Sequence, residues 1–178
     1  YISIPSIALT TDYPNEGTAS HKITDAWVYV DNDLIGAFEL PAKFPVLTND
    51  GTHTVRIKAG IKMNGISSLR VDYPFYNYTE ASYILTAGQI TTITPTVTYR
   101  TATTFEWLED FESAGHTFND TLTAAGITQV TNEVFEGNKS GHIHLNNDTF
   151  ACEIQSNPFL SLPTDGRAIF LELNYKGT

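Results

Sequence analysis

The chain has 178 residues, of which 41% are hydrophobic and 12% aromatic, so wholesale disorder is excluded and a buried core is expected. Ten Lys and Arg residues face twenty Asp and Glu residues, and this net charge of −10 excludes the contiguous cationic surface that nucleic acid requires. No stretch approaches the roughly 18 apolar residues that span a bilayer, and the single cysteine, Cys152, excludes an intramolecular disulfide.

Residues 1–100 alternate between apolar and polar side chains in the way that strands do, and Gly, Asn, Asp and Pro separate the alternating stretches. Residues 2–9 are expected to form an edge strand, because Pro5 removes one N–H from the ladder. Further strands are predicted over residues 26–31, 34–40, 44–47, 53–58, 80–85 and 90–99, with turns at residues 31–33, 49–51 and Gly88. This series predicts a β-sandwich of about seven strands.

The order of these features resembles the small β-sandwich domains named for the PEGA motif. The residues that fit the pattern are Val28, Val30, Asp31, Ile35, Gly36, Pro41, Gly51, His53, Val55, Ile57 and Gly60. The sequence Gly-Ala-Phe-Glu at residues 36–39 stands where that family has its tetrapeptide. The resemblance implies a sandwich fold and says almost nothing about activity.

Longer stretches of the same region are similar to surface lipoproteins of Bacteroidetes. These stretches are residues 20–31, 35–47, 60–66 and 73–76, and the similarity covers roughly residues 1–100. It implies an exported protein of the outer membrane or cell surface. It also implies a lipidated cysteine upstream of Tyr1, which would be the protein's only link to the membrane.

A shift in composition at residues 100–104 predicts a second module over residues 104–178, which carries three basic residues against eleven acidic ones. Residues 105–113 resemble the opening of jelly-roll modules in secreted adhesins and carbohydrate-binding proteins, and residues 136–145 and 168–175 fit later strands. The fold class is therefore expected to be all-β, with two consecutive β-sandwich modules, 1–100 and 104–178. Four or five strands fall short of the eight in a jelly roll, so we expect further strands beyond Thr178. The alternatives are a strand donated by a partner and an atypical small sheet.

The acidic opening of the second module is a candidate Ca²⁺ site. On a strand, Glu106, Asp110 and Glu112 would share one face, and Glu109 would take the other. Calcium takes six to eight oxygen ligands, many from backbone and distant loops, so the alternative is a solvated acidic face. No other cofactor is expected.

Three further features bear on whether the protein binds a metal or catalyses a reaction. His142 and His144 would share one face of a strand, as a metal pair or as an exposed polar face, with Ile143 and Leu145 pointing inward. Cys152 is expected to be a buried, inert thiol. No pair of glycosidase carboxylates, nucleophile elbow, phosphate loop or zinc spacing stands out, so we expect a protein that is not an enzyme.

The densest aromatic run is residues 73–78, where Tyr73, Phe75, Tyr76 and Tyr78 accompany Pro74. Rings with hydroxyl rims stack sugars or anchor protein partners, so these four residues are the predicted binding surface. The alternative is that they pack the two modules together or fill the first core. Thr121, in an Asp-Thr-Leu sequence, matches the site of protein O-glycosylation in Bacteroidetes.

Two functions from different classes follow from this sequence. The first is a structural or interaction subunit of an outer-membrane or cell-surface assembly, with a protein partner. The second is a carbohydrate-binding accessory lipoprotein, with a glycan as ligand. The first is favoured, because tryptophan is confined to Trp27 and Trp107 and no Trp-rich groove is indicated.

Overall fold

The computed structural model describes residues 1–119, 123–159 and 161–177. It divides into two compact units, residues 1–104 and 105–178, each of which is described here by itself. The protein is all-β: the first unit contains one helix of four residues, α1 (Tyr13–Glu16), and one 3₁₀ turn (Met63–Gly65), and both units are otherwise built from strands and loops. The predicted all-β class is confirmed.

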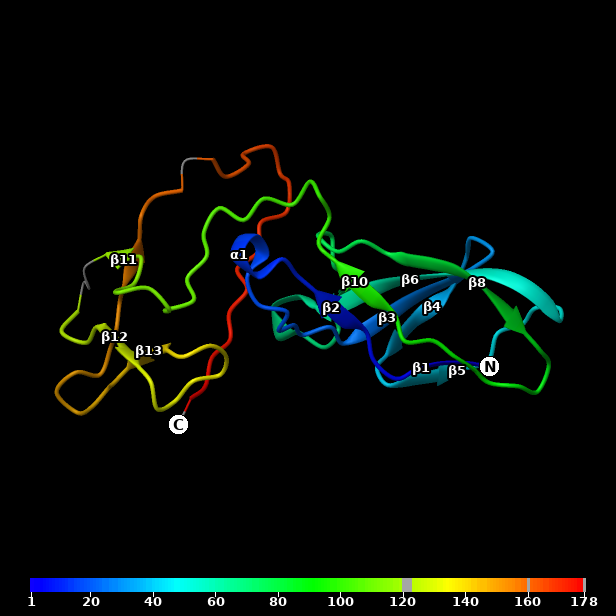
Figure 1. The fold of residues 1–178 in the computed structure, drawn as a ribbon, viewed down its shortest axis with the longest axis horizontal. Coiled ribbons are helices and arrows are strands. Elements are labelled where there is room, and N and C mark those ends of the chain that lie inside the picture. Colours follow the sequence, from blue (N-terminus) through cyan, green and yellow to red (C-terminus); the bar gives the residue numbers. More distant parts are fainter. Residues whose placement is uncertain (120–122, 160, 178) are drawn as a thin grey trace. The chain divides into compact units, whose positions relative to one another are not determined.

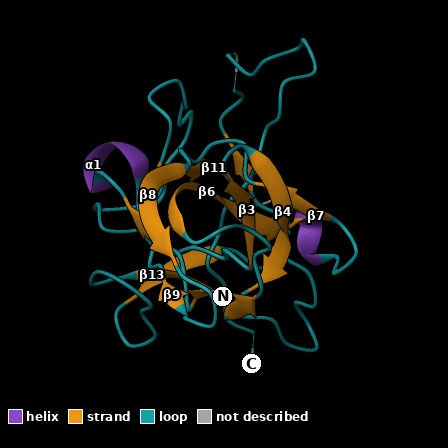
Figure 2. Ribbon diagram, turned by 90° about the vertical axis from the view of Figure 1, so that its right-hand side faces the viewer, coloured by secondary structure: helices purple, strands orange, loops and turns teal. Residues whose placement is uncertain are grey.

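The larger layer of the first unit is an antiparallel sheet of five strands (Figure 1). It runs β4 (Asp33–Glu39), β3 (Asp25–Val30) and β6 (Gly51–Lys62), and β6 then pairs with both β7 (Arg70–Asp72) and β8 (Thr79–Leu85). The turn between β3 and β4 contains Asp31 and Asn32 at φ of 51° and 74°, the left-handed conformation that tight hairpins require. Figure 2 shows the sheet curling through β8, β6, β3 and β4.

The second layer is made of shorter strands. Strand β1 (Ile2–Ile4) lies between β5 (Ala42–Phe44), which is antiparallel to it, and β9 (Thr91–Thr92), which is parallel. Strand β2 (Ala8–Thr10) pairs in parallel with β10 (Thr96–Thr98). The expectation of one edge strand over residues 2–9 is wrong, because the pairing stops at Pro5 and resumes at Ala8, and because β1 has a neighbour on each side.

The core of the first unit lies between these layers. Ile2 and Ile4 of β1 are at most 1% exposed, as is Ile7 in the segment before β2. Val28, Val55, Ile57 and Val97 are buried to the same degree. Alternation puts Ala26, Val28 and Val30 of β3 on this buried side. Each fully buried aliphatic side chain contributes about 1.5–3 kcal/mol, so this core anchors both layers.

The described part of the second unit has four short strands in two antiparallel pairs. Strand β11 (Phe118–Asn119) pairs with β14 (Gln155–Ser156), and β12 (Ile127–Val130) pairs with β13 (Ser140–Ile143). Residues 105–113 and 168–175, predicted as strands, have no ladder partner and are irregular. Among the described residues of this unit, Ala125 is the one buried hydrophobic side chain.

Candidate functional site

The predicted aromatic surface divides between the core and the exterior. Tyr73 and Tyr76 are 5% and 6% exposed, their ring centroids are 4.5 Å apart, and Tyr76 lies 5.0 Å from the ring of Tyr99. Their placement on a binding surface is therefore wrong, because a backbone bridge between Tyr76 and Tyr99 draws this segment into the core. Phe75 is half-buried and Tyr78 is half-exposed, so Tyr78 is the ring that is most open to a partner.

Tyr78 belongs to an aromatic face on the outward side of the five-stranded sheet. We define this outer face by Trp27, Tyr29 and Tyr78 together with the cations Arg56 and Lys58. Alternation in β3 turns Trp27 and Tyr29 away from the core, and both are half-buried. The Arg56 guanidinium lies 5.0 Å from the centroid of the Tyr78 ring, and the Lys58 ammonium lies 5.6 Å from that of Tyr29. Each cation therefore holds one ring in place by a cation–π contact.

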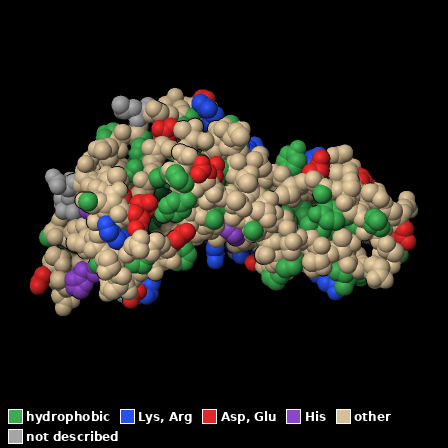
Figure 3. Space-filling view, in the orientation of Figure 1, with side chains coloured by type: hydrophobic (Ala, Val, Ile, Leu, Met, Phe, Trp, Pro, Cys, Tyr) green, Lys and Arg blue, Asp and Glu red, His purple; other side chains and the backbone are tan. Residues whose placement is uncertain are grey.

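Ion pairs between strands border the outer face. Their nitrogen–oxygen distances are 2.6 Å for Arg56–Glu80, 3.0 Å for Lys58–Asp72, 2.9 Å for Lys62–Glu39 and 2.8 Å for Arg70–Glu39. The Lys62 ammonium, and after it the Arg70 guanidinium, lowers the pKa of Glu39. Exposed pairs of this kind contribute about 0–1 kcal/mol each, so their main effect is to fix side-chain positions. Figure 3 shows charged side chains of both signs interspersed with hydrophobic ones on the visible face of the protein.

Arg70, one of these bordering cations, also pairs with a fully buried carboxylate, that of Asp25. The Asp25 carboxylate is 0% exposed, and it accepts hydrogen bonds from the Arg70 guanidinium and, at 2.6 Å, from the Thr24 hydroxyl. A buried carboxylate is tolerated only where such donors compensate for the lost water. Arg70 thus ties the start of β3 to β7, at the margin of the outer face.

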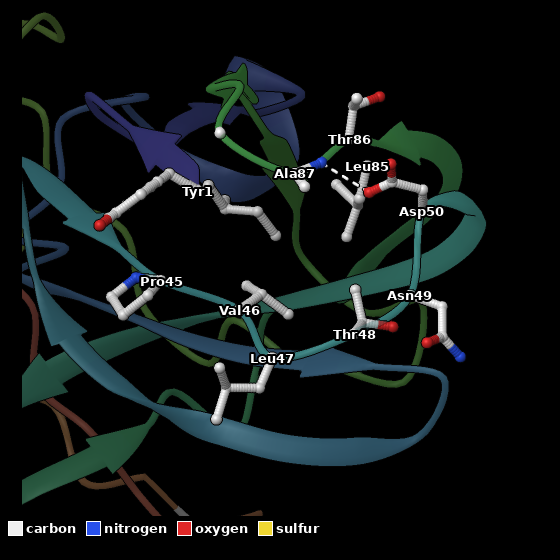
Figure 4. A pocket seen from close by; sticks show the side chains of 12 residues that line it. Tyr1, Pro45, Val46, Leu47, Thr48, Asn49, Asp50, Leu85, Thr86 and Ala87 are labelled. Atoms are coloured by element: carbon white, nitrogen blue, oxygen red, sulfur yellow. Dashed lines mark hydrogen bonds between the residues drawn. The ribbon is translucent and has the colours of Figure 1, made fainter.

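A cavity of about 220 Å³ lies at one end of the first unit. It is lined by Tyr1 and Ile2, by the loop of residues 45–50, and by residues 85–88. In Figure 4, Val46 and Leu85 point toward the space between these segments and Leu47 points away from it. The Asp50 carboxylate accepts a 2.6 Å hydrogen bond from the Ala87 N–H, which joins the two walls.

Two of the three carboxylates predicted to bind Ca²⁺, Asp110 and Glu112, accept hydrogen bonds from backbone N–H groups. Glu112 accepts from the N–H of Asn138 at 2.7 Å and of Lys139 at 2.9 Å, and Asp110 accepts from the Glu112 N–H at 3.0 Å. Glu106 is exposed, whereas Glu112 is half-buried, because residues 105–113 form no strand that would align them. In the part of the chain that the structure describes, no three His, Cys, Asp or Glu side chains gather to hold a metal ion.

The loop of residues 111–115 turns its carbonyls toward two side-chain nitrogens. Gln129 Nε2 donates to the carbonyls of Phe111, Ser113 and Gly115 at 2.6–3.0 Å. Lys139 Nζ donates to the carbonyls of Glu112 and Ser113 at 3.1 and 2.9 Å. The Lys139 ammonium therefore neutralises part of the negative potential that these carbonyl oxygens create.

The remaining candidates in the second unit are placed as follows. The rings of His142 and His144 lie 6.2 Å apart on an exposed stretch, but Ile143 and Leu145 are 42% and 49% exposed, so their expected inward packing is wrong. The unit has too little core for this strand to bury a face. Cys152 is free but half-buried, so the expectation of a buried thiol is wrong, and its backbone forms a bridge with Ala125. Thr121 lies outside the described residues.

Comparisons with known proteins found no match among family models, curated proteins or solved structures. Among the described residues, no helix is long and apolar enough to cross a membrane.

Sequence reasoning missed the cationic partners of the aromatic rings on the outer face. The alternation of residues 26–31 places Trp27 and Tyr29 opposite the core, but it does not show that Arg56 and Lys58 lie beside the exposed rings. A usable signal was the alternation of β6, which puts Thr54, Arg56 and Lys58 on the side away from Val55 and Ile57.

Proposed function

We propose that this chain is a non-catalytic interaction subunit of a bacterial outer-membrane or cell-surface assembly, and that a protein partner docks on the outer face of the five-stranded sheet. The observation that carries the proposal is the pairing of Tyr78, 50% exposed, with Arg56 at 5.0 Å. Aromatic and arginine side chains are the residue types that anchor protein interfaces.

The way in which strands and hydrogen bonds position these two side chains supports the same function. Tyr78 lies just before β8, and Arg56 is in β6, the strand that pairs with both β3 and β8. Glu80 at 2.6 Å and Asn32 at 3.1 Å hold the guanidinium over the ring. A partner that binds there meets ordered side chains, so it loses little conformational entropy at the surface. The surrounding ion pairs supply a polar rim.

The test is a comparison of two tyrosine variants of the full chain. Tyr78→Ala removes the half-exposed ring of the outer face (50%), and Tyr175→Ala, the control, removes a more exposed ring (87%) from the second unit. We expect Tyr78→Ala to reduce quantitative recovery of a crosslinked partner from solubilised envelope by at least tenfold, about 1.4 kcal/mol. Equal recovery with both variants would contradict docking at the outer face.

A carbohydrate ligand is the second candidate, and the half-exposed Tyr78 ring favours it as well, because sugar rings stack on such faces. A glycan array with wild type and Tyr78→Ala separates the two. Binding to a defined glycan that Tyr78→Ala abolishes would assign the outer face to sugar. Protein crosslinking without any glycan signal would assign it to a protein partner.

The cell-surface location and the lipid anchor rest on the resemblance of residues 1–100 to surface lipoproteins. Metabolic labelling of the native protein in its own bacterium with a palmitate analogue tests the anchor. We expect label in the outer-membrane fraction. Native protein that carries no lipid and fractionates away from the envelope would overturn this part of the proposal.

A further inference from the structure

His53 stands where three segments of the first unit meet, away from the outer face. Its Nδ1 lies 2.6 Å from an Asp31 carboxylate oxygen in the turn between β3 and β4, and its Nε2 lies 2.9 Å from the Asn49 carbonyl in the loop before β6. The imidazole side chain is only 12% exposed. Both ring nitrogens therefore face hydrogen-bond acceptors.

The two contacts together specify a protonation state. A neutral imidazole has one N–H and one lone pair, whereas the imidazolium has two N–H donors. Only the imidazolium can donate to Asp31 and to Asn49 at the same time. In the neutral form, one nitrogen would point a lone pair at an acceptor less than 3 Å away.

The groups around His53 favour the imidazolium. The charged residues on the adjoining segments are Asp31 and Asp33 in the turn, Asp50 in the loop and Arg56 on β6, whose guanidinium is directed to Asn32. The hydroxyl of Thr48 lies 3.3 Å from Nε2, and Tyr83 of β8 is paired with His53 in register. The hydrogen bond to Asp31, followed by that to the Asn49 carbonyl, raises the pKa of His53 above its ordinary value.

The loop that His53 holds is a wall of the 220 Å³ cavity. Residues 45–50 form that wall, and Asp50 reaches the opposite wall through its 2.6 Å bond to the Ala87 N–H. The loop is thus fixed at two neighbouring points, Asn49 to His53 and Asp50 to Ala87. Loss of the first releases the segment that positions the second.

We propose that the protonation state of His53 controls the position of the 45–50 loop. As an imidazolium, His53 ties this loop to the turn between β3 and β4 and so fixes one wall of the cavity. As a neutral ring, it lets that wall move. The shape of the cavity therefore depends on pH. The device lies within the first unit and does not depend on the docking function proposed for the outer face.

The test is an NMR pH titration of the full chain between pH 5 and about 8.5, a window that spans ordinary histidine pKa values. We expect the His53 ring protons to titrate above the ordinary value of about 6.5. The amides of Thr48, Asn49 and Ala87 should shift with the same midpoint. Protection of the Ala87 N–H from hydrogen exchange should fall on the order of tenfold across that midpoint.

Two internal controls and one variant make the titration decisive. His21 should titrate below the ordinary value, because burial lowers its pKa, and the amides of Leu9 and Val97 in the β2–β10 pair should not follow His53. A His53 midpoint at or below that of His21 would overturn the proposal. So would loop amides that stay unchanged through the His53 midpoint, or that titrate identically in His53→Gln.

Discussion

The indole of Trp27 lies flat against Gly60: a Cβ at position 60 would stand 2.9 Å from the indole Cδ1 and Nε1. Lys58 of β6 is the direct neighbour of Trp27, so the ring reaches diagonally toward Gly60, which is paired with Asp25. The indole N–H is buried and has no hydrogen-bond partner there. This contact explains why the chain has a glycine inside a strand, a position where glycine usually weakens the sheet.

Gly60→Ala is expected to destabilise the first unit by about 1–3 kcal/mol, because the added methyl overlaps the indole and the Asp25 Cβ at 3.0 Å. Urea denaturation measures the loss. In a double-mutant cycle with Trp27→Ala, the alanine at position 60 should cost at least about 1 kcal/mol less. Purely additive effects would show that the ring does not set the size of residue 60.

Alanine substitutions of two tyrosines in the aromatic run should destabilise the protein by very different amounts. Tyr76→Ala removes a ring that is 6% exposed and should cost about 3–5 kcal/mol, whereas Tyr78→Ala removes one that is 50% exposed and should cost under about 1 kcal/mol. Thermal and chemical unfolding of both variants checks this. Similar losses for both would contradict the division of the run between core and surface.

Arg70→Ala should cost about 2–3 kcal/mol, because it leaves the fully buried Asp25 carboxylate with the Thr24 hydroxyl as its remaining side-chain donor. The loss is expected at the lower end for a buried pair, since the Arg70 side chain is 29% exposed. Lys62→Ala is the matched control, and it should cost under about 1 kcal/mol because its partner Glu39 is 56% exposed. Equal effects would mean that Asp25 draws no stability from Arg70.

In the second unit, Lys139→Met should cost about 1–3 kcal/mol, because the Glu112 and Ser113 carbonyls lose their charged donor. Lys176→Met is the control, since its pair with Glu133 lies on the exposed surface. Hydrogen exchange of the amides around residues 111–115 localises the change. Greater destabilisation by Lys176→Met would argue against a stabilising contact between the Lys139 ammonium and the carbonyls of residues 112 and 113.

The pair of His53 and Asp31 should make stability depend on pH in a defined window. His53 has a raised pKa, so its contribution is complete below about 6.5 and is lost as pH rises through the folded-state value. Asp31 has a lowered pKa, mainly through His53, so its contribution is present above about 3.9 and is lost as pH falls through its folded-state value. Denaturation midpoints of wild type and Asp31→Asn at pH 5 and pH 8 check this. The two proteins should differ more at pH 5.

Strands with a nearby turn and strict alternation were predictable. The predicted strands 26–31, 34–40 and 80–85 correspond to β3, β4 and β8 within a residue or two, and each pairs with a neighbour in the same sheet. Strand β3 buries one whole face, whereas Leu85 is the one buried residue of β8 and β4 has none. Residues 168–175 alternate just as well, yet they form no ladder, and Leu171 and Leu173 are 72% and 62% exposed. Alternation shows which face a segment can bury, but a strand also needs a neighbouring strand, and that neighbour cannot be read from local sequence.

The site was harder to predict, for a related reason. The density of rings at residues 73–78 indicated a large aromatic area, but the contact of Tyr76 with Tyr99 that buries it joins residues far apart in the chain. The same holds for Arg56 over Tyr78 and for His53 beside Asp31, each of which depends on strand register. Residue types were visible in the sequence, and their pairing was not.

The parallel pairing of β1 with β9 and of β2 with β10 has a mechanical consequence. When the first unit is pulled between its first strand and the segment that leaves β10, parallel strands are drawn past each other lengthwise. Their hydrogen bonds then carry the force together and must break together, whereas a hairpin pulled open at one end loses them singly. The first unit should therefore resist unfolding in that direction, and single-molecule pulling between residues 1 and 104 should require more force than pulling β3 from β4.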